Sequence, residues 1–568
     1  MLRLVYRLII LSVAEDRDLL FPPETSPDAR KRYDAFYSLG RLRETAALLR
    51  GSPHPDLYRG LRLLFELLRT GYPALGVPAL GGFLFSPRAT PALDATDIAN
   101  TALLDTIRAL NFSVDGKVRR AVDYRNLDSE ELGSVYESLL ELHPQVNVAA
   151  ATFALVVVAG SERKTTGTHY TATPLVSQLL DSALEPVIAA RLAEAQGSRG
   201  AGEKGRGGER GTQYAPRTTP VMREHLERAL LSIRILDYAS GSGHILIGAA
   251  RRLARRLAQI RTGDEEPSPA DLRAALRDVI RHCIYGVDIN AMAVELCKVA
   301  LWMESLEPGK PLSFLDHHIQ CGNSLVGTGI RGQGTGVRSQ ESGGREQQSL
   351  ELAEDEETGL VVPDEAFVAV AGDDKAAASF LRKLNRTERS MNAPLIFLQT
   401  QEDLVRWQRA RAAALEAMPE DSAEQVAGKA SAYEQYLASP AYRREKLAHD
   451  LWSAAFFWPL APGAGTGALP APTHGQLARA RAGQPLDEGL SRQIAALAER
   501  VPFFHWTLAF PEVFTPPPDS PSPARGGGRA FRGRFLTGAP CGRRSRPRFG
   551  IETAEGQGDA GKRCGQNH

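Results

Sequence analysis

Residues 232–260, SIRILDYASGSGHILIGAARRLARRLAQI, set the fold class of this chain. The apolar run that starts the segment predicts a buried strand ending at Asp237, and the glycines after it predict a turn into a long helix. Residues 283–306, CIYGVDINAMAVELCKVALWMESL, repeat the change from strand to helix. Alternating units of this kind predict an α/β fold with a parallel sheet and helices on its faces.

The glycine turn and the strand ends carry the candidate chemistry. Gly241 and Gly243 lack the Cβ atoms that would keep a ligand from the backbone, and free N–H groups at a helix start favour a carboxylate or phosphate. Asp288 ends the second predicted strand, where it could accept hydrogen bonds from two ribose hydroxyls, and the amide of Asn323 could contact an adenine edge. These groups favour an adenosine ligand. NAD and FAD are disfavoured because Leu246 occupies the third glycine position of GxGxxG.

The chain has 568 residues, of which 43% are hydrophobic and 24% are charged. This composition is ordinary for a globular protein and excludes collagen-like, wholly disordered and disulfide-scaffold classes. Helical periodicity and glycine-rich stretches predict its division into parts. These are a helical N-terminal domain (1–150), a core (151–328) with a flexible loop at 196–211, a linker (329–364), a helical insertion (365–500), a return to the core (501–514) and a tail (515–568).

The tail differs in composition from everything before it. It holds 11 glycines and 7 prolines, with 10 basic and 4 acidic residues, whereas residues 1–514 hold 58 basic and 63 acidic residues. The net charge of +1 is therefore the sum of two unlike pieces. A segment of this composition cannot bury a core, so the tail is predicted to be disordered.

The cysteine pattern and the first segment bear on the cellular compartment. The five cysteines form no CxxC pair, which favours a reducing cytoplasm and neither a zinc ribbon nor a disulfide framework. The opening stretch LRLVYRLIILSVAEDRD is interrupted by Arg3 and Arg7 and is too short to span a bilayer. It predicts a buried amphipathic helix, and no membrane partner is expected.

Four segments combine into a recognisable set: RKTTGTHYTATPLV (163–176), LDYASGSGHILIGA (236–249), YGVDINAMAVELCKVALWMESLEPGKPLSFLDHHIQCGNSLVG (285–327) and FFHWTLAFPEVF (503–514). With AEDRDLL (14–20) near the start, they resemble the large adenine-specific DNA methyltransferases of restriction-modification and phage-defence systems, including type IIG enzymes. The resemblance implies a class I, Rossmann-like core dependent on S-adenosylmethionine, with a helical N-terminal domain and a helical insertion. It also implies double-stranded DNA with a flipped adenine as partner, and a restriction or defence subunit alongside.

The residues that match the family's cofactor-binding positions are Gly167, Tyr170, Thr171, Asp237, Gly241, Gly243, Asp288 and Asn323. By this resemblance the first three hold the methionine end of S-adenosylmethionine and the next three form the cofactor turn. The last two contact the ribose and the adenine. The chain departs from the family pattern in having Ala172 for a usual proline, and Tyr238 and Ser240 for a usual proline and cysteine.

The family's catalytic loop, Asn-Pro-Pro followed by an aromatic residue, does not occur in the 568 residues. In that loop a flipped adenine stacks on the aromatic ring, and the asparagine and a prolyl carbonyl accept hydrogen bonds from its amine. The segments FPPE (21–24) and TPPP (515–518) lack the asparagine. We therefore expect an incomplete core from a truncated or frame-shifted reading frame, with no catalytic residue assigned. A native basic tail is the alternative.

Two classes of function remain open from the sequence. The first is transfer of a methyl group from S-adenosylmethionine to the exocyclic amine of adenine in DNA; the second is a non-catalytic remnant that binds cofactor or DNA. A small-molecule or protein methyltransferase is a more distant alternative. Loss of the fourth strand is expected to leave the strand ending at Asp237 with an unpaired edge, unless residues 507–514 complete the sheet.

Three further patterns favour ordinary structural roles, and no metal ligand is predicted. His317 and His318 look like a metal pair, but adjacent residues of a helix or strand face different ways, so turn or surface histidines are expected. Trp506 lies in a run apolar enough to fill a core rather than stack on a base. Asp364 with residues 373–375 imitates a nuclease signature, but the stretch is predicted to be helical.

Overall fold

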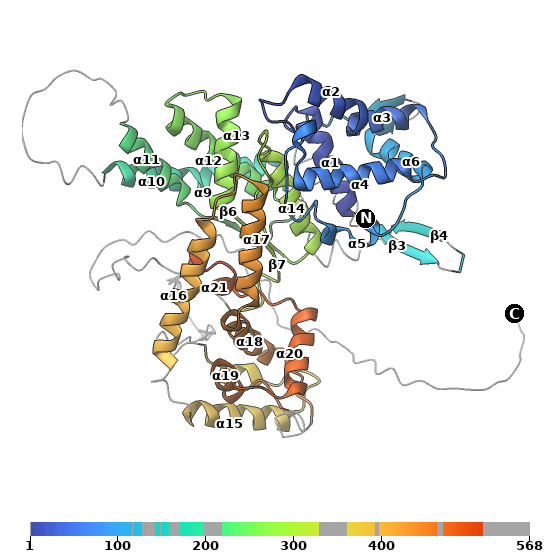
Figure 1. The fold of residues 1–568 in the computed structure, drawn as a ribbon. Helices are drawn as coiled ribbons and strands as arrows, with labels where there is room; N and C mark the ends of the chain where they lie inside the picture. The colour runs from blue at the N-terminus through green and yellow to red at the C-terminus, as the bar shows by residue number, and fades with distance from the viewer. Residues whose placement is uncertain are drawn as a thin grey trace, which may run out of the picture.

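A computed structural model gives the fold of the chain (Figure 1). In that view the N-terminal helices and the parallel sheet lie in the upper part, and helices from the later half of the chain form the lower part. The residues that the structure describes are 2–115, 118–127, 131, 142–147, 149–150, 152–157, 171–197, 219–328, 360–391, 397–462 and 470–514.

The N-terminal part is built mainly from helices. These are α1 (Leu2–Asp16), α2 (Pro27–Phe36), α3 (Leu39–Leu48), α4 (Asp56–Thr70), α5 (Pro91–Asp94) and α6 (Asn100–Asn111), with 3-10 turns η1 (Pro73–Leu75) and η2 (Pro87–Ala89). The first helix is buried as predicted. The buried guanidinium of its Arg7 donates hydrogen bonds to the carbonyls of Leu84 at 2.7 Å and Ser86 at 2.9 Å. Among the residues that the structure describes, no helix is both long and apolar enough to cross a membrane.

Two antiparallel hairpins depart from the expectation of helix over residues 1–150. β1 (Phe112–Asp115) pairs with β2 (Val118–Ala121), and β3 (Leu142–Asn147) pairs with β4 (Thr152–Val157). Asp115 pairs with Val118, so Gly116 and Lys117 separate the first two strands in the sequence, and a glycine at the first position of a two-residue loop is a hairpin signal.

The motif AEDRDLL joins α1 to its neighbours through its charged side chains. The Glu15 carboxylate accepts hydrogen bonds from the N–H groups of Leu39 and Gly40 at 2.8 and 2.9 Å, at the start of α3, and from the Tyr33 hydroxyl at 2.7 Å. Negative charge at a helix N-terminus is favourable. Arg17 donates to backbone carbonyls of Arg125, Leu127 and Met303. The motif is therefore a structural junction in this chain.

The central element is a parallel sheet of three strands in the order β5-β6-β7. β5 (Ile235–Asp237) pairs with β6 (Ile284–Asp288), which pairs with β7 (Ile319–Cys321). The expected parallel arrangement is thus confirmed. The helices that pack on it are α12 (His244–Thr262), α13 (Pro269–Cys283) and α14 (Ala291–Glu304). The helices α9 (Thr173–Ala183), α10 (Glu185–Gly197) and α11 (Pro220–Leu231) form a further group, in which α9 and α11 contact α12.

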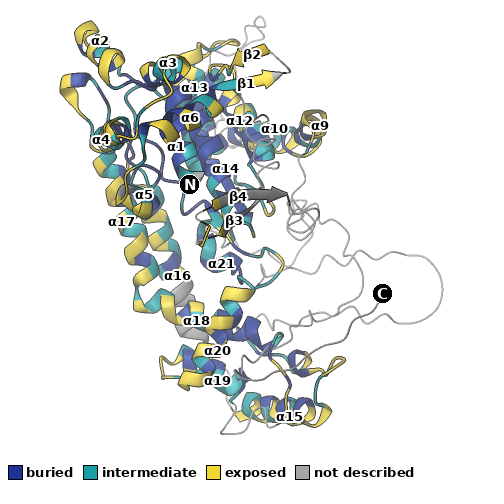
Figure 2. Cartoon of the chain, turned by 90° about the vertical axis from the view of Figure 1, so that its right-hand side faces the viewer, coloured by how far each residue is buried: buried dark blue, intermediate teal, exposed yellow. Residues whose placement is uncertain are grey.

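The two faces of β6 are covered by different segments. Ile284 belongs to the large core shared with α12, α13 and the N-terminal helices. Figure 2 colours the buried residues of the described chain dark blue. Tyr285 and Val287 point to the other face, where they pack against Phe504, Trp506 and Phe510. The alternation follows from the two-residue period of a strand.

Residues 506–514 cover the sheet rather than extend it. They form the short helices α21 (Trp506–Ala509) and α22 (Pro511–Phe514). The suggestion that residues 507–514 complete the sheet is therefore wrong. Within the described part of the chain β5 pairs with β6 alone, and the one further parallel bridge joins Phe503 to Asn323 beyond β7.

The lower part of Figure 1 is a helical layer with its own core. It consists of η3 (Asp364–Phe367), α15 (Lys375–Met391), α18 (Pro440–Ala455), α19 (His474–Arg481) and α20 (Glu488–Arg500). Helices α16 (Phe397–Glu416) and α17 (Ala423–Ala438) run between this layer and the sheet.

Two buried polar networks tie these helices to the sheet region. Glu420 pairs with Lys429 at 2.7 Å and accepts the Phe314 N–H at 3.1 Å, and both members of the ion pair are fully buried. His505 donates from Nε2 to Asp450 at 2.9 Å, and its Nδ1 accepts the N–H of Thr328 at 3.2 Å. Breaking a buried pair leaves an uncompensated charge, so these contacts fix the position of the insertion.

The glycine turn before α12 generates a first prediction. A Cβ atom on Gly243 would lie 2.7 Å from the sulfur of Cys297, and its φ is +85°, whereas a Cβ on Gly241, at φ +51°, would meet no atom within 4 Å. Gly241→Ala should cost about 1–2 kcal/mol of unfolding free energy from backbone strain. Gly243→Ala should cost about 2 kcal/mol more because of overpacking, measured by urea unfolding.

The matched control is the double variant Gly243→Ala/Cys297→Ala, which removes the sulfur and should recover part of the loss. Equal losses for the two single alanine variants would contradict the close packing of the turn on α14.

Candidate functional site

The predicted site residues of the sheet converge at the carboxyl ends of β5, β6 and β7. Asp237 and Asp288 are the last residues of β5 and β6, and Asn323 lies two residues after β7. The turn from Gly241 to Gly243 lies beside them, because the Ser240 N–H donates to the Val287 carbonyl at 3.0 Å. In parallel sheets this edge is where ligands bind.

The Asp288 carboxylate is the polar centre of this arrangement. One oxygen accepts the Gly241 N–H at 2.9 Å, and the other accepts the Asn290 N–H at 2.8 Å. The backbone carbonyl of Asp288 accepts the Gly322 N–H at 2.9 Å. A carboxylate oxygen has more than one lone pair, so both oxygens can still accept hydroxyl donors.

Asp237 lies close to the Asp288 carboxylate, and the charged form of its side chain is disfavoured there. Burial raises its pKa, a hydrogen bond from the Ala239 N–H lowers it in part, and the negative charge of Asp288 raises it. The two carboxylates therefore repel each other across the glycine turn. A ligand that supplies donors between them would relieve this repulsion.

Asn323 is held mainly by its backbone. Its N–H donates to the Pro502 carbonyl at 2.7 Å, and its side-chain oxygen accepts the Leu325 N–H at 3.1 Å. One lone pair of the side-chain oxygen is engaged in this way, so its second lone pair and the amide nitrogen are the groups that Asn323 can offer to the predicted adenine.

The structure describes only part of the segment that is predicted to hold the methionine end of S-adenosylmethionine. Gly167 and Tyr170 lie outside the described residues, and Thr171 comes just before α9. The hydroxyl of Thr173 at the start of α9 lies 3.5 Å from Nε2 of His244 at the start of α12. The N-termini of two helices thus meet beside the glycine turn, which favours negative charge there.

Exposed apolar side chains follow the strand ends. Tyr238 comes after Asp237, Ile289 after Asp288 and Leu325 after Asn323, and they are 47%, 44% and 86% exposed. Exposed apolar groups beside polar ones are typical of a ligand site for a flat, partly apolar molecule.

Two other residues that the sequence singled out, Trp506 and Asp364, have structural roles. Trp506 is buried in the core against the sheet, as predicted. Asp364 is bound by Asn385, Arg386 and Arg389, so its charge is already used within the helical layer.

The expectation for the adjacent histidines is wrong in part. His317 and His318 lie in a turn, as expected, but both are buried and both face Glu416. The rule that neighbouring residues face opposite ways applies to helices and strands and fails in a turn. Burial lowers the pKa of each histidine, so both are neutral near pH 7.

Several buried polar groups outside the strand-end site have no sequence motif. His282 and Glu416 are separated by more than one hundred residues, yet Nδ1 of His282 lies 2.5 Å from the Glu416 carboxylate. Thr328, Asp450 and His505 also come together only by folding. Their partners lie more than fifty residues apart in the sequence, so no local pattern indicates these contacts.

Comparison with known proteins gives one relative in sequence. The chain is 27% identical over 285 residues to a protein of Methanocaldococcus jannaschii (strain ATCC 43067 / DSM 2661 / JAL-1 / JCM 10045 / NBRC 100440) named "Putative type II restriction enzyme and methyltransferase". The match covers 46% of this chain and 22% of the relative, so the chain matches about a fifth of that protein's length. The similarity to restriction-modification methyltransferases that the motifs indicated is confirmed.

A solved structure of the Type IIL restriction-modification enzyme MmeI in complex with DNA is also similar, at 15% identity and a TM-score of 0.33. The likeness covers 53% of this chain and 32% of that chain. No protein-family model matches the sequence.

The repulsion between Asp237 and Asp288 generates a prediction on stability. Because the folded-state pKa of Asp237 is raised, its contribution to stability is full below the unfolded pKa of about 3.9 and is lost as pH rises through the folded pKa. Asp237→Asn should therefore be more stable than the parent at pH 7.5, by up to about 1 kcal/mol because the site is partly solvated.

The measurement is thermal unfolding without ligand at pH 7.5 and at pH 3.5, where the difference should disappear. Asp264→Asn, in an exposed loop, is the matched control and should change neither value. A less stable Asp237→Asn at pH 7.5 would show that the repulsion is not significant.

Proposed function

We propose that this chain carries the S-adenosylmethionine-binding half of an adenine-specific DNA methyltransferase of a restriction-modification or defence system. The core from 151 to 328 is then a class I, Rossmann-like methyltransferase core, flanked by the N-terminal helical domain and interrupted by the helical insertion at 365–500. The relative's name supports the class of system. Adenine as target rests on the motif resemblance.

The hydrogen bond from Gly241 to Asp288 is the observation on which the proposal chiefly depends. It places a carboxylate with free lone pairs at the end of the middle strand, next to a backbone with open space above it. Two adjacent ribose hydroxyls are donors that suit such a carboxylate. The apolar side chain of Ile289 and the amide of Asn323 then suit the faces and edge of an adenine.

The residues present fit the cofactor by their chemistry. Once bound, S-adenosylmethionine supplies a methyl group activated by positively charged sulfur. Asp288 would hold the ribose, and the helix N-termini at Thr173 and His244 would face the carboxylate of the methionine end. Gly167, Tyr170 and Thr171 are proposed to line that end, and Asp237 its ammonium.

Transfer to DNA needs acceptors for the amine of a flipped adenine. The Asn-Pro-Pro-aromatic sequence that supplies them in the resembled family does not occur in the 568 residues, so we assign no catalytic residue. The second candidate function is accordingly a non-catalytic chain that binds the cofactor and transfers nothing. DNA is the proposed partner in either case.

The ribose role of Asp288 generates a binding prediction. Calorimetric titration with S-adenosylmethionine should give one site per chain, and Asp288→Ala should weaken it at least about 10-fold, since hydrogen bonds to charged groups contribute about 1.5–3 kcal/mol. Asp264→Asn should bind as the parent does. Absence of binding to the folded parent, or equal affinity of Asp288→Ala, would sink the proposal.

The role of Ile289 is tested separately because its side chain is exposed and supports little of the core. Ile289→Ala should weaken S-adenosylmethionine binding several-fold while leaving the unfolding free energy within about 0.5 kcal/mol of the parent. Leu48→Ala, an exposed leucine of the N-terminal helices, is the matched control. Unchanged affinity would remove Ile289 from the site.

Methyl transfer distinguishes the two candidate functions. Incubation with labelled S-adenosylmethionine and double-stranded DNA, followed by nucleoside analysis, detects methylated adenine. Binding without transfer supports the non-catalytic chain. Transfer would show that another segment performs the work of the missing sequence.

A further inference from the structure

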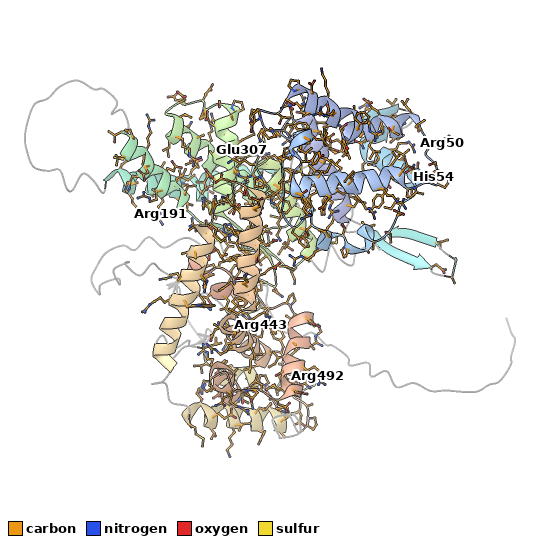
Figure 3. All side chains as sticks on the ribbon, in the orientation of Figure 1. Arg50, His54, Arg191, Glu307, Arg443 and Arg492 are labelled. Atoms are coloured by element: carbon orange, nitrogen blue, oxygen red, sulfur yellow. The ribbon has the colours of Figure 1, made fainter. Side chains whose placement is uncertain are left out.

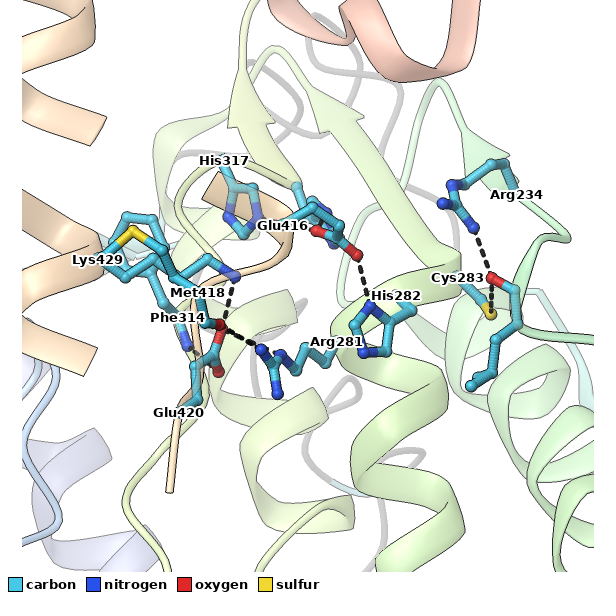
Figure 4. Close-up of polar contacts among 12 residues, drawn as sticks. Arg234, Arg281, His282, Cys283, Phe314, His317, Glu416, Met418, Glu420 and Lys429 are labelled. Carbon is cyan, nitrogen blue, oxygen red and sulfur yellow. Dashed lines mark hydrogen bonds and ion pairs between the residues drawn. The ribbon is translucent and has the colours of Figure 1, made fainter. Parts of the chain in front are cut away.

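A buried cluster of three histidines and a glutamate lies at the amino ends of β6 and β7, whereas the proposed cofactor site lies at their carboxyl ends. Figure 4 shows two of these histidines and the glutamate. His282 comes from α13, His317 and His318 from the turn before β7, and Glu416 is the last residue of α16. Three segments far apart in the sequence therefore bring imidazole and carboxylate groups to one point.

The distances in this cluster are close to those between ligands of one small cation. Oε2 of Glu416 lies 3.6 Å from Nε2 of His317 and 3.6 Å from Nε2 of His318. One ligand atom from each of the three residues lies within 4.8 Å of the others. Ligands about 2.0–2.1 Å from a tetrahedral zinc ion are about 3.3–3.4 Å apart, so small side-chain movements would suffice.

The ring nitrogens of the two adjacent histidines lack hydrogen-bond partners among the described residues. Within the described residues, neither ring nitrogen of His317 or of His318 makes a hydrogen bond, although His318 is completely buried and His317 is 8% exposed. A buried polar group without a partner costs about 1–3 kcal/mol. Native structures satisfy nearly all such groups, so these nitrogens indicate a missing partner.

The charge of Glu416 also lacks a cationic partner among the described ion pairs. Its contacts are all to histidines, whereas Lys429 and Arg281 engage Glu420 instead. Figure 4 shows Glu416 facing His282 and His317, with Lys429 and Arg281 directed to Glu420. A buried carboxylate surrounded by imidazoles favours a bound cation.

We propose that His317, His318 and Glu416 form a binding site for a zinc-class divalent cation. Each histidine ligates through Nε2 and Glu416 through Oε2, and solvent completes the coordination. Nitrogen and oxygen ligands of this kind suit zinc, cobalt and nickel rather than magnesium or calcium. His282, hydrogen-bonded to the other Glu416 oxygen at 2.5 Å, orients the carboxylate from outside.

Aromatic rings hold the two proposed histidine ligands in place. Tyr285 packs on His318 with ring centroids 4.1 Å apart, and Phe314 stacks on His317 at 5.2 Å, which fixes the ring planes. The side chains of His282 and Glu416 retain 25% and 18% exposure, which leaves a route for entry. The cation would fasten the end of α16 to the turn before β7.

The first test uses the whole chain and needs no cofactor or DNA. After treatment with a chelator, the protein is titrated with zinc chloride, and bound metal is counted after gel filtration. One zinc per chain is expected, together with a higher melting temperature. Cobalt chloride should give the visible absorption of a four-coordinate cobalt site.

Variants assign the site to these residues. His317→Ala and Glu416→Gln should each weaken zinc binding by more than about 10-fold and abolish the rise in melting temperature. His282→Ala should weaken it about 10–100-fold, as removal of an outer partner does. His54→Ala is the matched control, because His54 is exposed in the loop before α4 (Figure 3), and it should bind as the parent does.

The outcomes that overturn the proposal are distinct from failure to fold. No zinc bound by the folded parent chain, or zinc bound equally by the parent and by folded Glu416→Gln, would leave the histidines as an aromatic stack without metal. If a variant does not fold, the metal count and cobalt spectrum of the parent still decide. Loss of S-adenosylmethionine binding would not affect either result.

Discussion

The close approach of the glycine turn to the middle strand is the constraint on which the rest of this structure depends. Gly243 packs against the sulfur of Cys297 on α14, and the N–H of Gly241 reaches the carboxylate of Asp288 on β6. The contact with Cys297 leaves no room for a Cβ at Gly243. These contacts set how α12 enters the large core, and they bring two carboxylates together at one edge of the sheet at an electrostatic cost. Packing and ligand chemistry are therefore decided by the same few backbone atoms.

The second half of the chain is positioned by buried polar contacts more than by continuity of the core. The helical layer has its own apolar cluster, and it meets the sheet region through Glu420 with Lys429 and through Thr328, His505 and Asp450. Such groups are costly to bury unless every partner is present, so they specify one arrangement where apolar contacts would tolerate several. The histidine cluster around Glu416 lies at this same junction. A cation there would add a further fixed link to it.

The two proposed sites differ in the chemistry that they offer. The strand ends present carboxylates, an amide and exposed apolar side chains, which together suit the hydroxyls and base of an adenosine. The cluster at Glu416 presents lone pairs of two buried imidazoles and a carboxylate, which suit a cation. The Asn-Pro-Pro-aromatic sequence does not occur in the 568 residues, so we propose cofactor binding at the strand ends and assign methyl transfer to neither site.

The sequence alone determined the features that depend on neighbouring residues. The strand, glycine turn and helix around Asp237, the parallel order and the position of Asp288 follow from periodicity and from glycine, because these are local preferences. Only the tertiary structure decided the features that depend on distant partners. Residues 506–514 form helices over the sheet, and the side-chain oxygen of Asn323 accepts a hydrogen bond. His317 and His318 both face the carboxylate of Glu416. Contacts between residues more than one hundred positions apart leave no periodic signal, since each is fixed by how complete elements pack.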